Sequence, residues 1–243
     1  MLLKACLNGT RQPGEHPELP LSAEDLARDA QDAIAAGAGT LHVHPRDDGT
    51  ETLAAHAVGE ALIAIRATCP GTPVGVSTGA WIEPDIGRRV AVIRSWDVRP
   101  DFASVNFAEA GASDVCAALD EIGVGMEAGI WSPSDARLLL ARGLADRCLR
   151  VMIELVLEQT TDDALATAQA IERVLDDANI WAPLLLHGEE ATAWPMLDYA
   201  LTRRYDIRIG LEDTLILPDG RRARDNAQLV TVAKARARAA NRE

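Results

Sequence analysis

Residues 125–155 read GMEAGIWSPSDARLLLARGLADRCLRVMIEL, with an apolar run at each end and a helical pattern between them. The two ends, Gly125–Trp131 and Cys148–Leu155, are apolar runs of a strand's length. Between them, Ser132-Pro-Ser-Asp precedes the helical pattern ARLLLARG and supplies a polar cap with an acid in the first turn. Gly143 ends this pattern, as a left-handed helix terminus requires. Because a helix between two strands returns the chain to the same edge of the sheet, the stretch predicts a parallel β-α-β unit.

The same alternation runs along the whole chain. Further short apolar runs lie at Leu2–Asn8, Thr40–His44, Pro73–Ser77, Phe102–Asn106, Pro183–His187 and Asp206–Glu212. Helical patterns separate them, with start signals at Ser22, Thr161 and Asp225-Asn226. Eight strands, each followed by a helix at a mean spacing of about 30 residues, predict a single-domain (β/α)8 TIM barrel over residues 1–243. An open, doubly wound α/β sheet is the alternative, but LNGTRQPG lacks the glycine-rich turn of that fold.

Composition restricts the classes of partner. The chain has 243 residues, with 24 basic and 37 acidic side chains and a formal net charge of −13. Nucleic acid and anionic membrane surfaces require clustered Lys and Arg, so we expect neither as a partner. No apolar run approaches the length of a membrane helix, and the apolar stretch in MLLKACLNGTR is too short for a secretory signal. Four scattered cysteines without CxxC spacing predict free thiols in a reducing cytoplasm.

Two histidines stand at the end of the second predicted strand, in the segment LHVHPRDDG that begins at Leu41. Because side chains alternate across a strand, His42 and His44 project to the same side, into the barrel. Active sites of such barrels lie at the carboxyl ends of the strands. Two imidazoles one pleat apart can chelate Zn²⁺ or another late first-row divalent ion. The alternative is that both are hydrogen-bonded core histidines.

The last predicted strand ends in RIGLEDT, residues 208–214. Arg208, Gly210 and Glu212 share one face of this strand, which lies two strands away from the histidines in a closed barrel. Glu212 can therefore reach the same metal, and two histidines with one glutamate and open positions form a catalytic ligand set. The alternative is a structural ion pair between Glu212 and Arg208. Asp213 follows at the rim, where a base with a tuned pKa could work.

Polar side chains also stand at other predicted strand ends, at Ser77, Thr78, Ser104, Asn106 and His187. Serine and threonine at such positions more often cap the following helix than bind a substrate. Glu127 lies inside the fifth predicted strand, where an unpaired buried carboxylate is costly. We therefore expect Glu127 to pair with a cation, either Arg208 or Arg46.

Several segments together resemble the β-keto acid cleavage enzymes, the group typified by 3-keto-5-aminohexanoate cleavage enzyme. They are NGTR…HPELP, HVHPRDDG, VSTG, ASVN and RIGLEDT…LPDG…DNAQLV, in order over nearly the whole chain. The HxHxR and GLED segments together are quite specific. The resemblance implies a zinc-dependent (β/α)8 homo-oligomer, a dimer or tetramer with one zinc ion per subunit. It also implies condensation of a β-keto acid with acetyl-CoA, releasing acetoacetate and the CoA thioester of the shortened acid.

The resemblance further implies roles for individual residues. The implied zinc ligands are His42, His44 and Glu212. Arg208 and Asp213 are similar to the dyad that removes a proton from the carbon between the keto group and the carboxylate, and Glu127 to the acid that supports this arginine. Ser77 and Ser104 match positions that hold the substrate carboxylate or the reacting carbonyl. The remaining candidate substrate contacts are Thr78, Asn106, Arg46 and Thr10.

Two departures from the family pattern leave other functions open. Thr10 stands where longer members carry an acid, and the sixth strand, VMIELVLEQTTDD, lacks their Gly- and Pro-rich loop. Glu154 and Glu158 make this strand end acidic, which disfavours a polyanionic cofactor such as CoA. A CoA-independent, metal-dependent aldolase or lyase acting on a keto acid is therefore the alternative enzyme. A binding barrel that keeps a metal only for stability is the third hypothesis.

Overall fold

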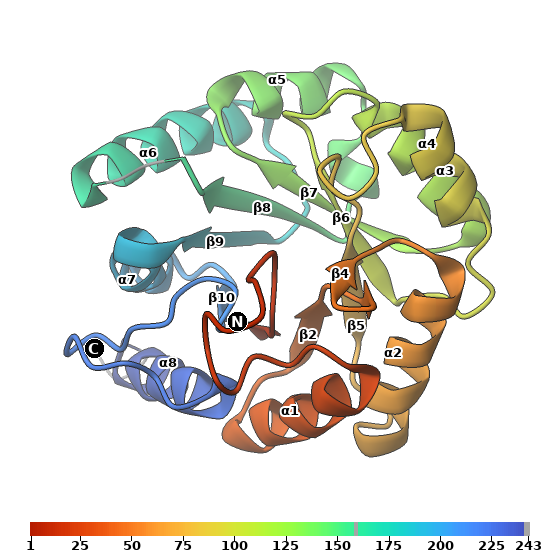
Figure 1. The fold of residues 1–243 in the computed structure, drawn as a ribbon. Coiled ribbons are helices and arrows are strands. Elements are labelled where there is room, and N and C mark those ends of the chain that lie inside the picture. The colour runs from red at the N-terminus through yellow and green to blue at the C-terminus, as the bar shows by residue number, and fades with distance from the viewer. Residues whose placement is uncertain (158–159, 241–243) are drawn as a thin grey trace.

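A ring of parallel strands surrounded by helices makes up the computed structural model, which describes residues 1–157 and 160–240 (Figure 1). The strands of the ring are β1 Leu3–Cys6, β2 Thr40–Val43, β5 Val74–Ser77, β6 Phe102–Asn106, β7 Gly125–Ile130, β8 Arg150–Leu155, β9 Leu184–Gly188 and β10 Ile207–Ile209. The helices are α1 Ala23–Ala36, α2 Ala55–Thr68, α3 Ile86–Arg94, α4 Ala112–Ile122, α5 Pro133–Ala141, α6 Thr161–Ala178, α7 Ala193–Arg203 and α8 Asn226–Ala240. Glu158, predicted at the acidic end of the sixth strand, lies outside the described residues.

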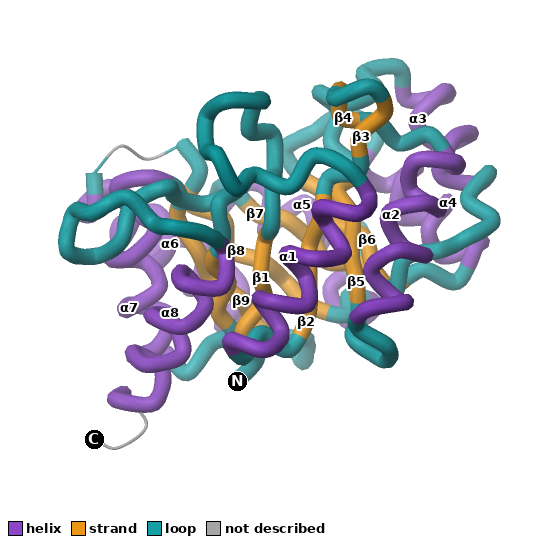
Figure 2. Tube along the Cα trace, turned by 60° about the horizontal axis from the view of Figure 1, so that its bottom comes forward, coloured by secondary structure: helices purple, strands orange, loops and turns teal. Residues whose placement is uncertain are grey.

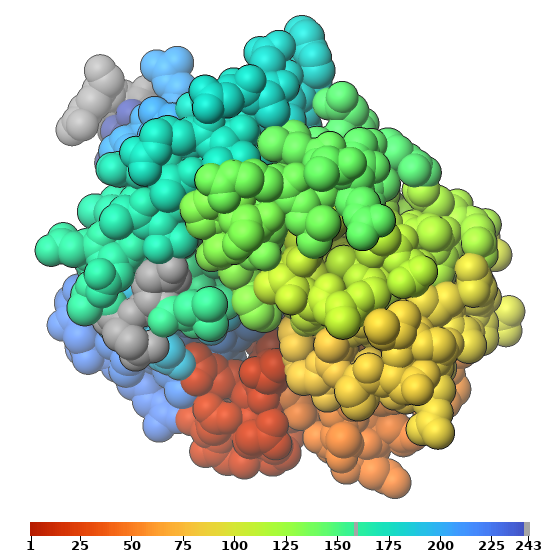
Figure 3. Space-filling view, turned by 90° about the horizontal axis from the view of Figure 1, so that it is seen from above, coloured from red at the N-terminus to blue at the C-terminus, as the bar shows by residue number. Residues whose placement is uncertain are grey.

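The strand order β10-β1-β2-β5-β6-β7-β8-β9 follows the chain, and every neighbouring pair is parallel. Backbone hydrogen bonds between Leu184–Leu186 and Asp206 bring β9 next to β10, so the ring closes nearly completely. Successive segments therefore lie side by side around the molecule, as the colour sequence in Figure 3 also shows. The predicted (β/α)8 barrel is confirmed, and the open sheet is excluded.

Helix α1 begins at the predicted cap, Ser22, whereas the cap of α6 is Thr160, one residue before the predicted Thr161. The Ser22 hydroxyl accepts the Asp25 N–H (3.1 Å) at the start of α1, and Thr160 accepts the Asp163 N–H (3.2 Å) at the start of α6. Such caps satisfy backbone donors that have no partner within the helix. None of the helices within the described ranges is both long and apolar enough to cross a membrane.

A small hairpin that the sequence reading did not predict follows β2. It consists of β3 Arg46–Asp47 and β4 Thr50–Glu51, joined through Asp48 and Gly49, which both have positive φ. Figure 2 shows this hairpin at the end of the barrel opposite the N-terminus. That end carries the carboxyl termini of the parallel strands, so the hairpin lies at the mouth of the barrel.

The last strand is shorter than predicted, because β10 ends at Ile209. The chain then turns, and the N–H groups of Asp213 and Thr214 both donate to the Gly210 carbonyl, at 3.0 and 3.1 Å. A Cβ on Gly210 would overlap the Cys6 carbonyl oxygen, so only glycine fits this close approach to β1. The turn, and not a strand face shared with Arg208, brings Glu212 to the mouth.

A buried ionic network fills the lower interior of the barrel. Lys4 is fully buried and forms an ion pair with Glu127, and its Nζ lies 5.1 Å from the centroid of the Phe102 ring. Arg150 contacts the other oxygen of Glu127 at 2.5 Å and Asp206 at 3.0 Å. The predicted pairing of Glu127 with Arg208 or Arg46 is therefore wrong. The strand register places Arg150 directly opposite Glu127, and Lys4 reaches it across the interior.

Candidate metal centre and active site

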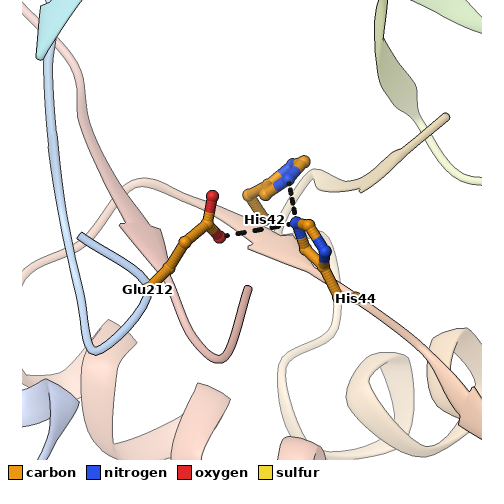
Figure 4. A group of neighbouring side chains, drawn as sticks. All are labelled: His42, His44 and Glu212. Carbon is orange, nitrogen blue, oxygen red and sulfur yellow. Dashed lines mark hydrogen bonds and ion pairs between the residues drawn. The ribbon is translucent and has the colours of Figure 1, made fainter. Parts of the chain in front are cut away.

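The side chains of His42, His44 and Glu212 converge at the mouth of the barrel (Figure 4). The two Nε2 atoms of the histidines lie 3.1 Å apart, and Glu212 Oε2 lies 3.6 Å from His44 Nε2. One ligand atom from each residue lies within 4.8 Å of the others. The end of β2 supplies both histidines and the turn after β10 supplies the glutamate, so the structure brings together the three residues that the sequence singled out.

This donor set suits a divalent metal ion. Glu212 Oε2 is buried without a hydrogen-bond partner among the described residues, and a buried oxygen in that state is costly. Burial lowers the pKa of His42 well below 6.5, which keeps the ring in the neutral form that binds metals. Burial alone would raise the pKa of Glu212, but Arg208 and His44 outweigh it and hold the carboxylate ionised. Three ligands facing a cavity match a catalytic site better than a closed structural one.

His44 is held by residues that the sequence reading did not predict. Its Nδ1 contacts Glu51 Oε1, and the Trp81 indole N–H donates to Glu51 Oε2 at 3.1 Å. The Trp81 and His44 rings are stacked, with centroids 6.4 Å apart. A carboxylate on Nδ1 fixes the ring orientation and directs Nε2 toward a metal. The Asp48-Gly49 pair is a hairpin signal that points to Glu51, whereas no sequence pattern indicates Trp81.

Arg208 links Glu212 to Asp213. Its Nε and Nη2 donate to Asp213 Oδ1 at 2.9 and 2.6 Å, and Nη2 also donates to Glu212 Oε1 at 2.6 Å. The ion pair between Arg208 and Glu212 is thus present, while the other oxygen of Glu212 faces His44. Asp213 Oδ2 is buried and has no hydrogen-bond partner within the described part of the chain. Burial raises the pKa of Asp213, although Arg208 opposes this shift.

A cavity of about 350 Å³ opens beside these groups. The residues that line it are Thr10, Arg11, Glu15, His42, His44, Ser77, Trp81, Ser104, Asn106, Trp131, Met152, Glu154, Val156, Glu189, Glu190, Arg208 and Glu212. They include four of the six predicted substrate contacts. The cavity therefore adjoins both the metal ligands and the guanidinium that binds Asp213.

Four other predicted site residues lie outside this lining. Asp213, predicted at the rim, is fully buried and reaches the cavity lining only through its contact with Arg208. Arg46 donates to the backbone carbonyls of Gly9 (3.0 Å) and Arg11 (2.6 Å) and so holds the first loop. The Thr78 hydroxyl donates to the Ser104 carbonyl at 2.6 Å. Glu127 belongs to the lower ionic network, below the cavity. Arg46, Thr78 and Glu127 therefore support neighbouring backbone or strands and do not line the cavity.

Comparison with known proteins identifies the family. A sequence model of the beta-keto acid cleavage enzyme family matches residues 1–243. The chain belongs to this family. A 3-keto-5-aminohexanoate cleavage enzyme of Fusobacterium nucleatum subsp. nucleatum is 24% identical over 254 residues, which covers 95% of this chain and 88% of the relative. The enzyme of the same name from Acetoanaerobium sticklandii is 23% identical over 252 residues, covering 95% and 89%.

Solved structures share the barrel at lower identity. A type I 3-dehydroquinate dehydratase from Clostridium difficile superposes with a TM-score of 0.66 and 12% identity, covering 98% of this chain and 92% of that one. An N-acetylmannosamine-6-phosphate 2-epimerase from Clostridium perfringens gives 0.59 and 14%, covering 88% and 87%. These similarities concern the fold alone. Membership in the β-keto acid cleavage enzyme family confirms the resemblance seen in the motifs and favours an enzyme over a metal-stabilised binding barrel.

Proposed function

We propose that this β-keto acid cleavage enzyme is zinc-dependent and condenses a β-keto acid with acetyl-CoA to give acetoacetate and a new acyl-CoA. The observation that carries the proposal is that the three candidate metal ligands and Arg208, the residue that binds Asp213, line the same cavity. The set formed by His42, His44 and Glu212 supplies three metal ligands. The Arg208–Asp213 pair supplies a carboxylate with one oxygen free of hydrogen bonds among the described residues.

Zinc, when bound, supplies a Lewis acid that stabilises the enolate of the keto acid. Asp213 accepts the proton from the carbon between the keto group and the carboxylate at Oδ2, its unpartnered oxygen. Arg208 holds Oδ1, orients the carboxylate and offsets the charge that develops in the transition state. Ser77 and Ser104 line the cavity and hold the substrate carboxylate or the reacting carbonyl.

The remaining steps exchange one acyl group for another. The enolate carbon attacks the acetyl carbonyl of acetyl-CoA, and the CoA thiolate leaves. The thiolate then attacks the original keto carbon, and the bond from this carbon to the central carbon breaks. Acetoacetate leaves as an enolate that takes back the proton from Asp213, and the other product is the new acyl-CoA.

The decisive assay supplies the zinc-loaded protein with β-keto acids, beginning with 3-keto-5-aminohexanoate, with and without acetyl-CoA. We expect acetoacetate and an acyl-CoA in equal amounts only when both substrates are present. Mass spectrometry with acetyl-labelled acetyl-CoA should place the label in acetoacetate. Absence of turnover for all β-keto acids in the presence of zinc and acetyl-CoA would contradict the proposal.

A CoA-independent, metal-dependent aldolase or lyase acting on a keto acid is the second candidate. The acidic lining of the cavity favours it, because Glu154, Glu189 and Glu190 oppose a polyanionic cofactor. Burial, with Asp213 as the next cause, raises the pKa of Glu189 to about 8. Glu189 is therefore largely protonated near neutral pH and adds less negative charge to the cavity than Glu154 and Glu190 do. Cleavage of the keto acid at an unchanged rate without acetyl-CoA would select this candidate.

The proposal includes a cytoplasmic homo-oligomer, either a dimer or a tetramer. The four cysteines Cys6, Cys69, Cys116 and Cys148 are all buried and unpaired, which fits a reducing compartment. Light scattering on the purified protein measures the number of subunits. A monomer would remove the oligomeric part of the proposal and leave the chemistry unaffected.

A further inference from the structure

The three candidate metal ligands lie at the spacing that zinc requires. Zinc bonds of about 2.0–2.1 Å at tetrahedral angles place two ligand atoms about 3.3 Å apart. The Nε2 atoms of His42 and His44 lie 3.1 Å apart, and Glu212 Oε2 lies 3.6 Å from His44 Nε2 (Figure 4). Because the histidines and the glutamate come from separate segments of the chain, contacts between those segments must fix this spacing.

The end of β1 lies between the two segments that carry the ligands. β1 pairs with β2 on one side and with β10 on the other. The Leu7 N–H donates to the His42 carbonyl at 3.0 Å. On the other side the Glu212 N–H donates to the Cys6 carbonyl at 3.3 Å, which is long for a backbone hydrogen bond. Beyond these bonds, two buried side-chain amides join β1 to the ligand segments.

Asn8 joins His44 to the end of β1. Its Oδ1 accepts the His44 N–H, and its Nδ2 donates to the His44 carbonyl, both at 2.9 Å. Nδ2 also donates to the Pro20 carbonyl at 3.2 Å, and Asn8 is fully buried. The amide thus binds both backbone polar groups of a candidate ligand, as a neighbouring strand would.

Asn226, the first residue of α8, joins the turn that carries Glu212 to the same end of β1. Its Oδ1 accepts the Leu211 N–H at 2.7 Å, and its Nδ2 donates to the Leu7 carbonyl at 2.8 Å. Nδ2 also donates to Asp29 at 2.6 Å, so both of its N–H groups have acceptors and the orientation of the amide is fixed. Asn226 is fully buried as well. Both ligand segments are therefore anchored to β1 by buried amides.

We propose that Asn8 and Asn226 are positioning residues of the metal centre, which hold His44 and Glu212 at the spacing that zinc requires. This inference rests on the zinc site of the proposed function. Neither asparagine lines the cavity, so each one acts through the ligand that it holds. Ligands that are already in place lose little conformational freedom when they bind the ion, which makes binding tighter. Loss of a residue that orients a metal ligand typically costs about 10–100-fold in metal affinity.

Zinc affinity, measured by competition with a chromophoric chelator, tests this role without any turnover. We expect Asn8→Ala and Asn226→Ala each to bind zinc about 10–100-fold more weakly than the wild type. Thr40→Val is the matched control, because it removes the hydroxyl of a buried threonine that donates to the Pro73 carbonyl at 2.9 Å. Thr40 begins the strand that ends at the histidines, so its loss should lower stability and leave zinc affinity within about threefold of the wild type.

The absorption spectrum of the cobalt-substituted protein separates positioning from general stability. Co²⁺ can take the place of zinc, and its visible bands depend on the arrangement of the ligand atoms. At saturating Co²⁺ we expect both asparagine variants to have shifted or weakened bands, and Thr40→Val to have the wild-type spectrum. A merely structural role would lower the free energy of unfolding in urea and leave the spectrum of the folded protein unchanged.

A measurement on the wild type alone covers the case in which a variant does not fold. Hydrogen exchange followed by NMR reports on His44 and Leu211, whose N–H groups donate to the two asparagines. In the zinc-free protein we expect their protection factors to lie within about tenfold of that of Leu7, whose N–H is bonded within the barrel. Fast exchange of His44 and Leu211 without zinc would show that the amides do not hold the ligand segments, and would overturn the proposal.

The outcomes distinguish this inference from the proposed function. Wild-type zinc affinity and a wild-type cobalt spectrum in both asparagine variants would overturn the positioning role and leave the zinc site intact. An equal loss of zinc affinity in Thr40→Val would also overturn it, because the loss would then follow stability. A wild type that binds no zinc would contradict the proposed function and this inference together.

Discussion

Gly9 controls the position of Glu212, one of the three candidate metal ligands. Its φ is +54°, and a Cβ at this position would overlap Glu212 Cγ. In the Gly9→Ala variant we expect Glu212 to move away from the histidines and zinc affinity to fall at least about tenfold, because one of three ligands is displaced. Competition with a chromophoric chelator measures this affinity.

Gly14 provides a matched control for the backbone strain. It has a φ of +94°, and a Cβ there would meet no atom within 4 Å. Gly14→Ala should lose about 1 kcal/mol of stability through its positive φ and keep the wild-type zinc affinity. If Gly14→Ala lost as much zinc affinity as Gly9→Ala, the loss would come from loop strain and not from Glu212.

Asp213 is the residue on which proton removal depends. In Asp213→Asn we expect kcat to fall by a factor of about 10²–10⁴, because an amide cannot accept the substrate proton. Zinc content should remain at the wild-type level, since the three ligands are unchanged. Enzyme-dependent exchange of the substrate's central protons with D₂O, measured by NMR without acetyl-CoA, isolates this step. Wild-type exchange in the variant would assign the base to another group.

The β-α units were predictable from sequence because each one carries its own local signals. A polar cap such as Ser22 and a closing glycine such as Gly123 act within a few residues, and the structure contains both. The end of the last strand was not predictable, because the turn at Gly210 depends on close contact with Cys6 across the barrel seam. The β3–β4 hairpin has two residues per strand, too few for a periodic pattern.

The candidate site likewise combines features that the sequence predicts with features that only the folded barrel determines. Alternation along β2 places His42 and His44 on one side, and this follows from the sequence alone. Glu212 lies close to the two histidines only because the barrel closes, and the repeated alternation of strands and helices predicts that closure. The partners of Glu127 require the register between β7 and β8, and register cannot be read from one strand. Glu154 and His187 face each other only because β8 and β9 are neighbours.

The ionic network that joins β1, β7 and β8 contributes stability through buried charges. Lys4→Met removes one of the two cations on the fully buried Glu127. We expect the free energy of unfolding, measured with urea, to fall by about 3 kcal/mol. The reason is that the buried Glu127 carboxylate keeps only one of its two cationic partners. Arg28→Met, which removes an exposed ion pair with Asp25, should change this free energy by less than about 1 kcal/mol. Similar losses in both would show that burial of the network has no special effect.

The stability of the whole molecule should depend on pH through Asp29, which links α1 to α8. Burial raises the pKa of Asp29 to about 7, although the Asn226 amide donates to it at 2.6 Å. Its pKa is thus higher in the folded than in the unfolded state, where it is about 3.9. The folded state binds this proton more tightly than the unfolded state. The stabilisation that protonated Asp29 gives to the folded state is therefore fully present below the unfolded pKa and disappears as pH rises through about 7.

Urea unfolding at pH 5 and pH 8 measures this dependence against the Asp29→Asn variant. The wild type should lose about 2–3 kcal/mol more than the variant between these pH values, because asparagine does not ionise. The variant also keeps an amide oxygen that can accept from Asn226. Parallel losses in the two proteins would show that Asp29 does not titrate in this range.

The barrel as a whole presents one cavity that is lined by the candidate metal ligands and by Arg208, the residue that binds Asp213. The account depends most directly on the metal. Zinc content should therefore be measured on the wild type and on the His42→Ala/His44→Ala variant after both are supplied with zinc and freed of excess. We predict about one zinc per subunit in the wild type and none in the variant, as expected for a three-ligand catalytic site. A wild type without zinc, or a variant that binds as much, would contradict the account.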